Sequence, residues 1–125
     1  VNMSVPLFSS LGRSAATQKA KIALEKSERA LVNTRQELKI KIKRAQNELA
    51  FAQQDLETKK QAQNLAKRIE EKNQIKFFEG LASSFELSQA QTQLYNAQKQ
   101  YMEAMHSVLN KHIALDVLLN PNPIN

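Results

Sequence analysis

The residues that could do chemistry in this sequence lie toward its C-terminal end. Glu103 and His106 have the Glu-x-x-His spacing with which helical bundles hold paired iron ions. A centre of that kind needs a second copy of the motif and two further inward carboxylates, and the sequence has no second copy. The other histidine, His112, follows His106 by six residues and so falls on a different face of a helix. We therefore predict no metal site.

Other kinds of catalytic chemistry also lack their residues. The 125 residues include no Cys, which excludes disulfides and thiolate metal sites. The sequence has no Gly-rich phosphate loop and no signature of an activated nucleophile. We therefore predict neither an enzyme nor a cofactor.

The charge of the chain would suit a polyanion, but its distribution favours a solvated helix. The net charge is +6, from 18 basic and 12 acidic residues. The basic residues are spread around the helix and pair with acids at i,i+4, as in Glu25 with Arg29 and Glu37 with Lys41. We predict no nucleic-acid partner, and a nucleic-acid-binding coiled-coil arm is the less favoured alternative.

The first residues have the periodicity of a strand. Met3, Val5 and Leu7 alternate with polar residues, which predicts a strand over residues 1–8. Pro6 confines such a strand to an edge or a terminus. Because the chain opens inside this strand, we interpret it as a fragment or a mature piece of a longer protein. No apolar run approaches the roughly 18 residues of a transmembrane helix.

One long helix is expected next, over residues 11–79. Between Gly12 and Gly80 the chain has no Gly or Pro and is rich in Ala, Lys, Gln, Glu and Leu. Such a helix is roughly 100 Å long and cannot fold into a compact domain. Its apolar residues form a stripe of small side chains from Ala16 to Ala30 and then a coiled-coil seam. The seam comprises Leu38, Ile42, Ala45, Leu49, Ala52 and Leu56, and continues in a shifted phase with Ala62, Leu65 and Ile69.

A turn and a shorter helix complete the pattern. Gly80 is expected to end the long helix in the left-handed conformation, and Ser83 with Glu86 forms a capping box that opens a new one. The turn is predicted over residues 80–83, the return helix over 84–119 and a tail over 120–125. The return helix has two seam positions, one with Leu87, Leu94, Tyr101, Val108 and Leu115 and the other with Ala90, Ala97, Ala104, Lys111 and Leu118. Tyr95, Met102 and Leu109 form a flanking stripe suited to a core or a subunit interface.

These elements predict an all-α fold, a long antiparallel coiled-coil hairpin with unequal arms, preceded by a short β-strand. The short connection at Gly80 favours antiparallel packing. The return helix, at roughly 54 Å, would cover only about half of the long one.

The order of these features resembles the second structural repeat of a TolC-type outer-membrane efflux protein, over essentially the whole chain. The residues that carry the resemblance are Pro6-Leu7-Phe8 with Arg13, and Phe77-x-x-Gly80-x-x-Ser83 with Phe85-Glu86-Leu87, Ala90, Leu94 and Ala97. The resemblance implies a homotrimeric duct of a Gram-negative bacterium, with a membrane β-barrel that continues into a periplasmic helical barrel. Residues 1–10 would be the remnant of the last barrel strand and its junction with the helix, and a helix from the other repeat, absent here, would cover the upper half of the long helix.

In that family the duct is passive and exports small molecules or proteins. A periplasmic adaptor couples it to an inner-membrane pump and docks at the tip turn. The resemblance places this adaptor site on Phe77, Gly80, Leu81, Ala82 and Ser83, and it places a gate constriction at Glu86. Gln89 stands where a second acid is common, and Ala82 where a basic partner can occur, so this sequence departs from the ionic latch of some members.

Plainer interpretations stay open beside these. The turn residues could serve only as a helix-hairpin turn, and Glu86 only as the capping-box acid. At the level of the whole chain, the alternative is a periplasmic adaptor hairpin or a generic coiled-coil stalk, for which near-equal arms and no strand are expected.

Overall fold

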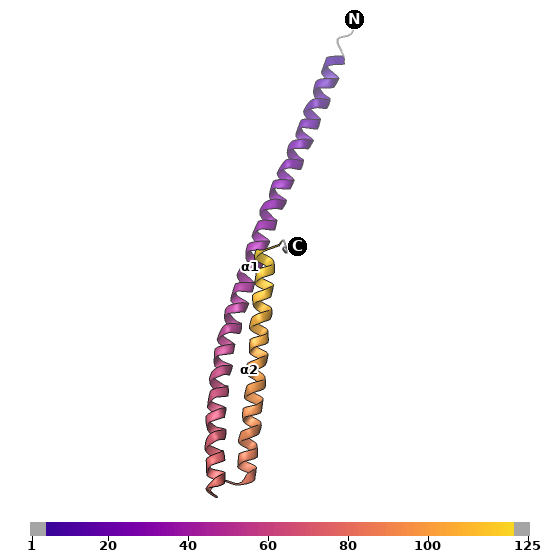
Figure 1. Cartoon of the computed structure of the whole chain (residues 1–125). Coiled ribbons are helices and arrows are strands. Elements are labelled where there is room, and N and C mark those ends of the chain that lie inside the picture. Colours follow the sequence, from indigo (N-terminus) through magenta and orange to yellow (C-terminus); the bar gives the residue numbers. More distant parts are fainter. Residues whose placement is uncertain (1–4, 122–125) are drawn as a thin grey trace. The chain divides into compact units, whose positions relative to one another are not determined.

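The structure is a computed structural model that describes the backbone of residues 5–121 and the side chains of residues 10–121. It contains two α-helices, α1 (Val5–Phe78) and α2 (Ser84–Leu119), shown in Figure 1. Their lengths of 74 and 36 residues confirm the predicted unequal arms. The chain divides into two units, Val1–Ile40 and Lys41–Asn125.

The first unit consists of the N-terminal part of α1. Every described side chain from Ser10 to Ile40 is exposed. The hydroxyl groups of Thr17, Ser27 and Thr34 each donate to the carbonyl four residues earlier, so they are satisfied within the helix. The large apolar residues exposed on this unit are Leu11, Ile22, Leu24, Leu31, Val32, Leu38 and Ile40.

The strand predicted over residues 1–8 is not seen in the described part of the chain. Residues 5–8 belong to the first turns of α1, and residues 1–4 lie outside the described residues. Pro6 is tolerated there because an N–H group in the first turn of a helix has no intrahelical acceptor. A helix also satisfies its backbone from within, whereas a strand needs a neighbour, and residues 5–121 contain no strand. The long helix therefore begins before residue 11.

The second unit is an antiparallel helical hairpin, as predicted. The turn reverses the chain and α2 packs along the C-terminal part of α1 (Figure 1). Every predicted seam position of α2 is buried or half-buried, and these positions recur every three or four residues. Ser107, next to one of them, is half-buried as well. The seam positions are Leu87, Ala90, Leu94, Ala97, Tyr101, Ala104, Val108, Lys111, Leu115 and Leu118. The seam of α2 is thus confirmed.

The seam of α1 differs from the prediction at its start and in the part nearer the turn. Its buried or half-buried residues keep one heptad phase throughout: Ile42, Ala45, Leu49, Ala52, Leu56, Lys59, Gln63, Ala66, Glu70 and Asn73. The predicted shift to Ala62, Leu65 and Ile69 is wrong, since all three are exposed. The predicted start at Leu38 is also wrong, because Leu38 is exposed and the seam begins at Ile42. A left-handed coiled coil brings the same heptad positions to its partner on every repeat, so an unbroken seam on α2 requires an unbroken one on α1.

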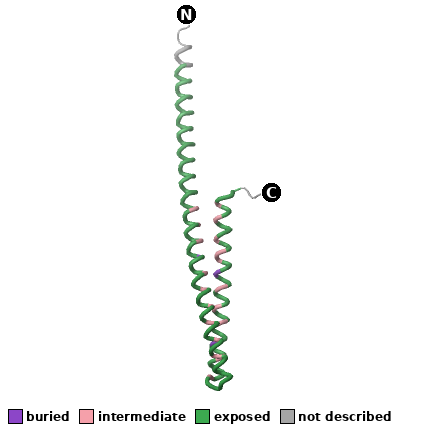
Figure 2. The backbone as a smooth tube through the Cα atoms, turned by 60° about the vertical axis from the view of Figure 1, so that its left-hand side comes forward, coloured by how far each residue is buried: buried purple, intermediate pink, exposed green. Residues whose placement is uncertain are grey.

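Small residues bring the two helices close together. The buried apolar residues of the described chain are Ala52, Ala90 and Ala104, all at seam positions, and Figure 2 shows that the buried and half-buried positions are confined to the hairpin. Lys111 Nζ and Glu48 Oε2 form an ion pair 2.9 Å apart across the helices. Both side chains are almost half exposed, so this pair fixes the register more than it adds stability.

Candidate functional site

The turn at the end of the hairpin is built by the backbone of residues 76–82. Gly80 has φ of +75°, in the left-handed region that favours glycine. The N–H of Leu81 donates to the Lys76 carbonyl at 2.7 Å and the N–H of Gly80 donates to the Phe77 carbonyl at 3.0 Å. These two bonds form a Schellman motif, which satisfies carbonyl groups at the end of α1. The predicted role of Gly80 is confirmed.

Ser83 and Glu86 close the other side of the turn. The N–H of Glu86 donates to Ser83 Oγ at 3.2 Å, and the N–H of Ser83 donates to Glu86 Oε2 at 2.7 Å. The Ser83 hydroxyl also donates to Glu86 Oε2, at 3.1 Å. This is the predicted capping box, and it fixes the start of α2.

The carboxylate of Glu86 is held in its ionised form by this network. The hydrogen bonds from the Ser83 backbone N–H and then from its hydroxyl lower the pKa of Glu86 below its ordinary value of 4.5, and the charge of Lys76 adds to the effect. Glu86 is therefore a capping acid in this structure. A constriction on a threefold axis is formed by several protomers, so the gate role of Glu86 stays a prediction.

Apolar side chains project from this turn into solvent. Phe78 is 79% exposed, and Leu81 and Phe85 are each 74% exposed. Phe77 is less exposed, and its ring packs edge-on against Phe78 with 6.0 Å between the centroids. We call the exposed set of Phe78, Leu81 and Phe85 the tip patch.

The residues predicted for the adaptor site differ in how far they are exposed, and Phe77, at 38% exposed, is much less exposed than Leu81. Gly80 and Ser83 build the turn, Ala82 is half-buried, and Leu81 is displayed outward. Sequence reasoning missed Phe78 and Phe85 as site residues. Both are large apolar residues next to the turn that fall outside the heptad seams, and that signal could have found them.

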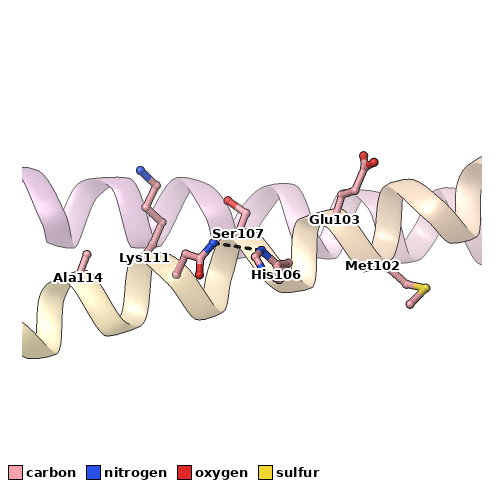
Figure 3. Close-up of a pocket in the computed structure, with 7 residues that line it drawn as sticks. Met102, Glu103, His106, Ser107, Lys111 and Ala114 are labelled. Carbon is pink, nitrogen blue, oxygen red and sulfur yellow. Dashed lines mark hydrogen bonds between the residues drawn. The ribbon is translucent and has the colours of Figure 1, made fainter.

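A second surface feature lies on α2, away from the turn. It is a shallow hollow of about 760 Å³ shown in Figure 3. Its lining residues are Met102, Glu103, His106, Ser107, Asn110, Lys111 and Ala114. His106 Nδ1 and Asn110 Nδ2 are 3.0 Å apart, a hydrogen bond within one helix (Figure 3). Among residues 5–121 no group of three or more His, Cys, Asp or Glu side chains is placed to hold a metal ion.

Comparison with known proteins decides between the alternatives. The family model described as "Outer membrane efflux protein" matches residues 1–121. The chain belongs to the outer membrane efflux protein family. No curated protein and no solved structure matches it.

Outer membrane efflux proteins are non-enzymatic TolC-type channels, which gives this chain a role in outer-membrane efflux. Membership in this family decides against an adaptor hairpin, a generic stalk and a nucleic-acid-binding arm. In the described part of the chain, neither helix has a segment that is both long and apolar enough to cross a membrane.

Proposed function

We propose that this chain is a periplasmic part of a trimeric efflux duct, and that its turn docks a periplasmic adaptor that couples the duct to an inner-membrane pump. The duct itself is passive, and its cargo is small molecules or proteins. The adaptor contacts residues 77–83 together with Phe85.

The observation that carries this proposal is the exposed tip patch on a turn with a fixed backbone. Phe78, Leu81 and Phe85 offer apolar area that α1 and α2 do not cover. The Schellman motif and the capping box hold that area in one conformation before any partner arrives. A preorganised apolar surface loses little conformational entropy on binding, so it suits a docking site.

Glu86 has a second proposed role at the same end of the hairpin. In a closed threefold tip, three copies of this carboxylate would converge near the axis and favour a bound cation. We propose that Glu86 constricts the duct in addition to capping α2. Glu86→Gln in the assembled trimer should change cation block or single-channel conductance, measured in planar bilayers, and unchanged block and conductance would leave Glu86 as a cap only.

Docking is tested by replacing the tip patch in the assembled efflux protein. Leu81→Ser and Phe85→Ser should each reduce co-purification of the adaptor and lower drug resistance. Leu65→Ser is the matched control, because Leu65 is an exposed leucine of the same hairpin away from the turn. Size-exclusion chromatography confirms that each variant still forms a trimer. Full adaptor binding by both tip variants would contradict the docking proposal.

A further inference from the structure

The side chains that α1 presents to α2 change in character after Leu56. We call Ile42, Ala45, Leu49, Ala52 and Leu56 the distal seam, and all five are apolar. We call the five that follow the turn-proximal seam, and four of them are polar: Lys59, Gln63, Glu70 and Asn73, with Ala66 between them. All ten are buried or half-buried, so the polar residues do face the partner helix.

The polar residues of the turn-proximal seam make no compensating bonds across the hairpin. The Asn73 side-chain amide donates to the Ile69 carbonyl of its own helix at 2.9 Å. Within the described residues, Lys59, Gln63 and Glu70 form no hydrogen bond or ion pair with α2. The ion pair that does cross the helices, between Glu48 and Lys111, belongs to the distal part.

The two parts of the seam are therefore stabilised by different interactions. Burial of apolar side chains is the main favourable term in helix pairing. In the distal part both helices supply it, since the distal seam of α1 meets Ala104, Val108, Leu115 and Leu118 of α2. In the turn-proximal seam the helices are close, since Ala90 is only 4% exposed, but polar side chains of α1 face it. Such side chains cover a neighbour with their stems while their polar heads stay hydrated, and polar residues at seam positions fix register at a cost in stability.

We propose that the turn-proximal part of the hairpin, residues 59–101, unfolds locally as a unit of its own. In these openings the distal part stays folded and paired. The closed form of the turn-proximal part depends more on the hydrogen bonds of the turn than the distal part does, because α1 brings one apolar residue, Ala66, to the seam there and five to the distal seam. The sequence thus combines a firmly paired distal segment with a loosely paired segment that the Schellman motif and capping box hold together. This inference does not depend on the efflux role.

Hydrogen–deuterium exchange on the full chain, read by mass spectrometry, tests the proposal. Amides of residues 63–75 and 87–97 should exchange at least about tenfold faster than amides of residues 45–56 and 104–112. Ser83→Ala removes the cap and should speed exchange in the turn-proximal part alone. A seam-filled variant, with Leu at the four polar seam positions, should bring the two parts to similar rates. Its four changes are Lys59→Leu, Gln63→Leu, Glu70→Leu and Asn73→Leu.

The sequence offers a matched control for the seam-filled variant. The residue after each polar seam position is exposed, and together these four have the same composition. The control carries Lys60→Leu, Asn64→Leu, Glu71→Leu and Gln74→Leu, and it should leave the difference in rates unchanged. Equal rates in the two parts of the unmodified chain would overturn the proposal. The proposal would also be overturned if the control variant slowed amide exchange in the turn-proximal part as much as the seam-filled variant does. The same holds if Ser83→Ala sped amide exchange equally in both parts.

Discussion

Gly80 offers a test in which backbone conformation is separated from crowding. Its φ of +75° is unfavourable for any residue with a Cβ atom. A Cβ added at Gly80 would meet no atom within 4 Å, so alanine there creates no clash. The whole penalty is then that of the left-handed conformation, roughly 1–2 kcal/mol. We expect Gly80→Ala to destabilise the hairpin by about 1 kcal/mol and Gly80→Val by more, while Gly80→Asn destabilises it least because Asn tolerates this region.

The assay is thermal and urea unfolding of the full chain followed by far-UV circular dichroism. A loss of about 1 kcal/mol corresponds to a fall in Tm of roughly 4–8 °C for a domain of this size. Gly12→Ala is the matched control: an added Cβ there also meets nothing within 4 Å, but Gly12 lies in α1 without a positive φ. Alanine should stabilise that helical position by about 0.5–1 kcal/mol. The reasoning is refuted if Gly80→Ala is neutral, or if Asn at this position is as destabilising as Val.

Three further outcomes follow from the same geometry. Ser83→Ala should destabilise the hairpin by about 1 kcal/mol in urea unfolding, because it removes the side-chain cap of α2. Since the folded state lowers the pKa of Glu86, its contribution is present above the ordinary value of 4.5 and is lost as the pH falls through the lower folded value. A pH series of unfolding should show this loss, and Glu86→Gln should reduce it to the part that comes from Glu48, whose pKa the hydrogen bond and charge of Lys111 lower in the same way. Ala90→Leu should destabilise by roughly 1–3 kcal/mol because Ala90 is buried between the helices, whereas Gln91→Leu, at an exposed position, should stay within about 0.5 kcal/mol by the same measurement.

The parts of the fold that could be predicted are those determined by local chemistry. The absence of Gly and Pro between Gly12 and Gly80 was enough to predict the long helix, and Gly80 with Ser83 and Glu86 was enough to predict the turn. The seam of α2 was also predicted in full, because its apolar residues keep one heptad phase from Leu87 to Leu118.

The errors arose where a partner element decides the outcome. Alternation of Met3, Val5 and Leu7 indicates a strand only if another strand pairs with it, and the described residues contain none. In α1 the apolar pattern predicts Leu65 and Ile69 as seam residues, but continuity with α2 keeps polar residues in the seam instead. Hydrophobicity along one helix does not reveal which neighbour covers it.

The same continuity explains why the tip patch was only partly predicted. A resemblance in sequence identified Leu81, whereas the exposure of Phe78 and Phe85 follows from the seam positions that the two helices use. The predicted seam of α2 already leaves Phe85 outside it, whereas the seam of α1 near the turn, which decides the exposure of Phe78, becomes clear only when both helices are placed together.

The reversal at Gly80 also brings two opposite helix dipoles side by side. The C-terminal end of α1 carries a partial negative charge and the N-terminal end of α2 a partial positive one, and only a few residues separate them. Lys76 lies in the last turn of α1 and Glu86 in the first turn of α2, so each dipole end also has a side chain of opposite sign. The fields of these opposite charges largely cancel away from the turn, which leaves Glu79, an exposed carboxylate in the turn itself, as one further negative charge. A partner that meets the tip patch therefore recognises it mainly by shape and apolar area, and its affinity should change only modestly with ionic strength.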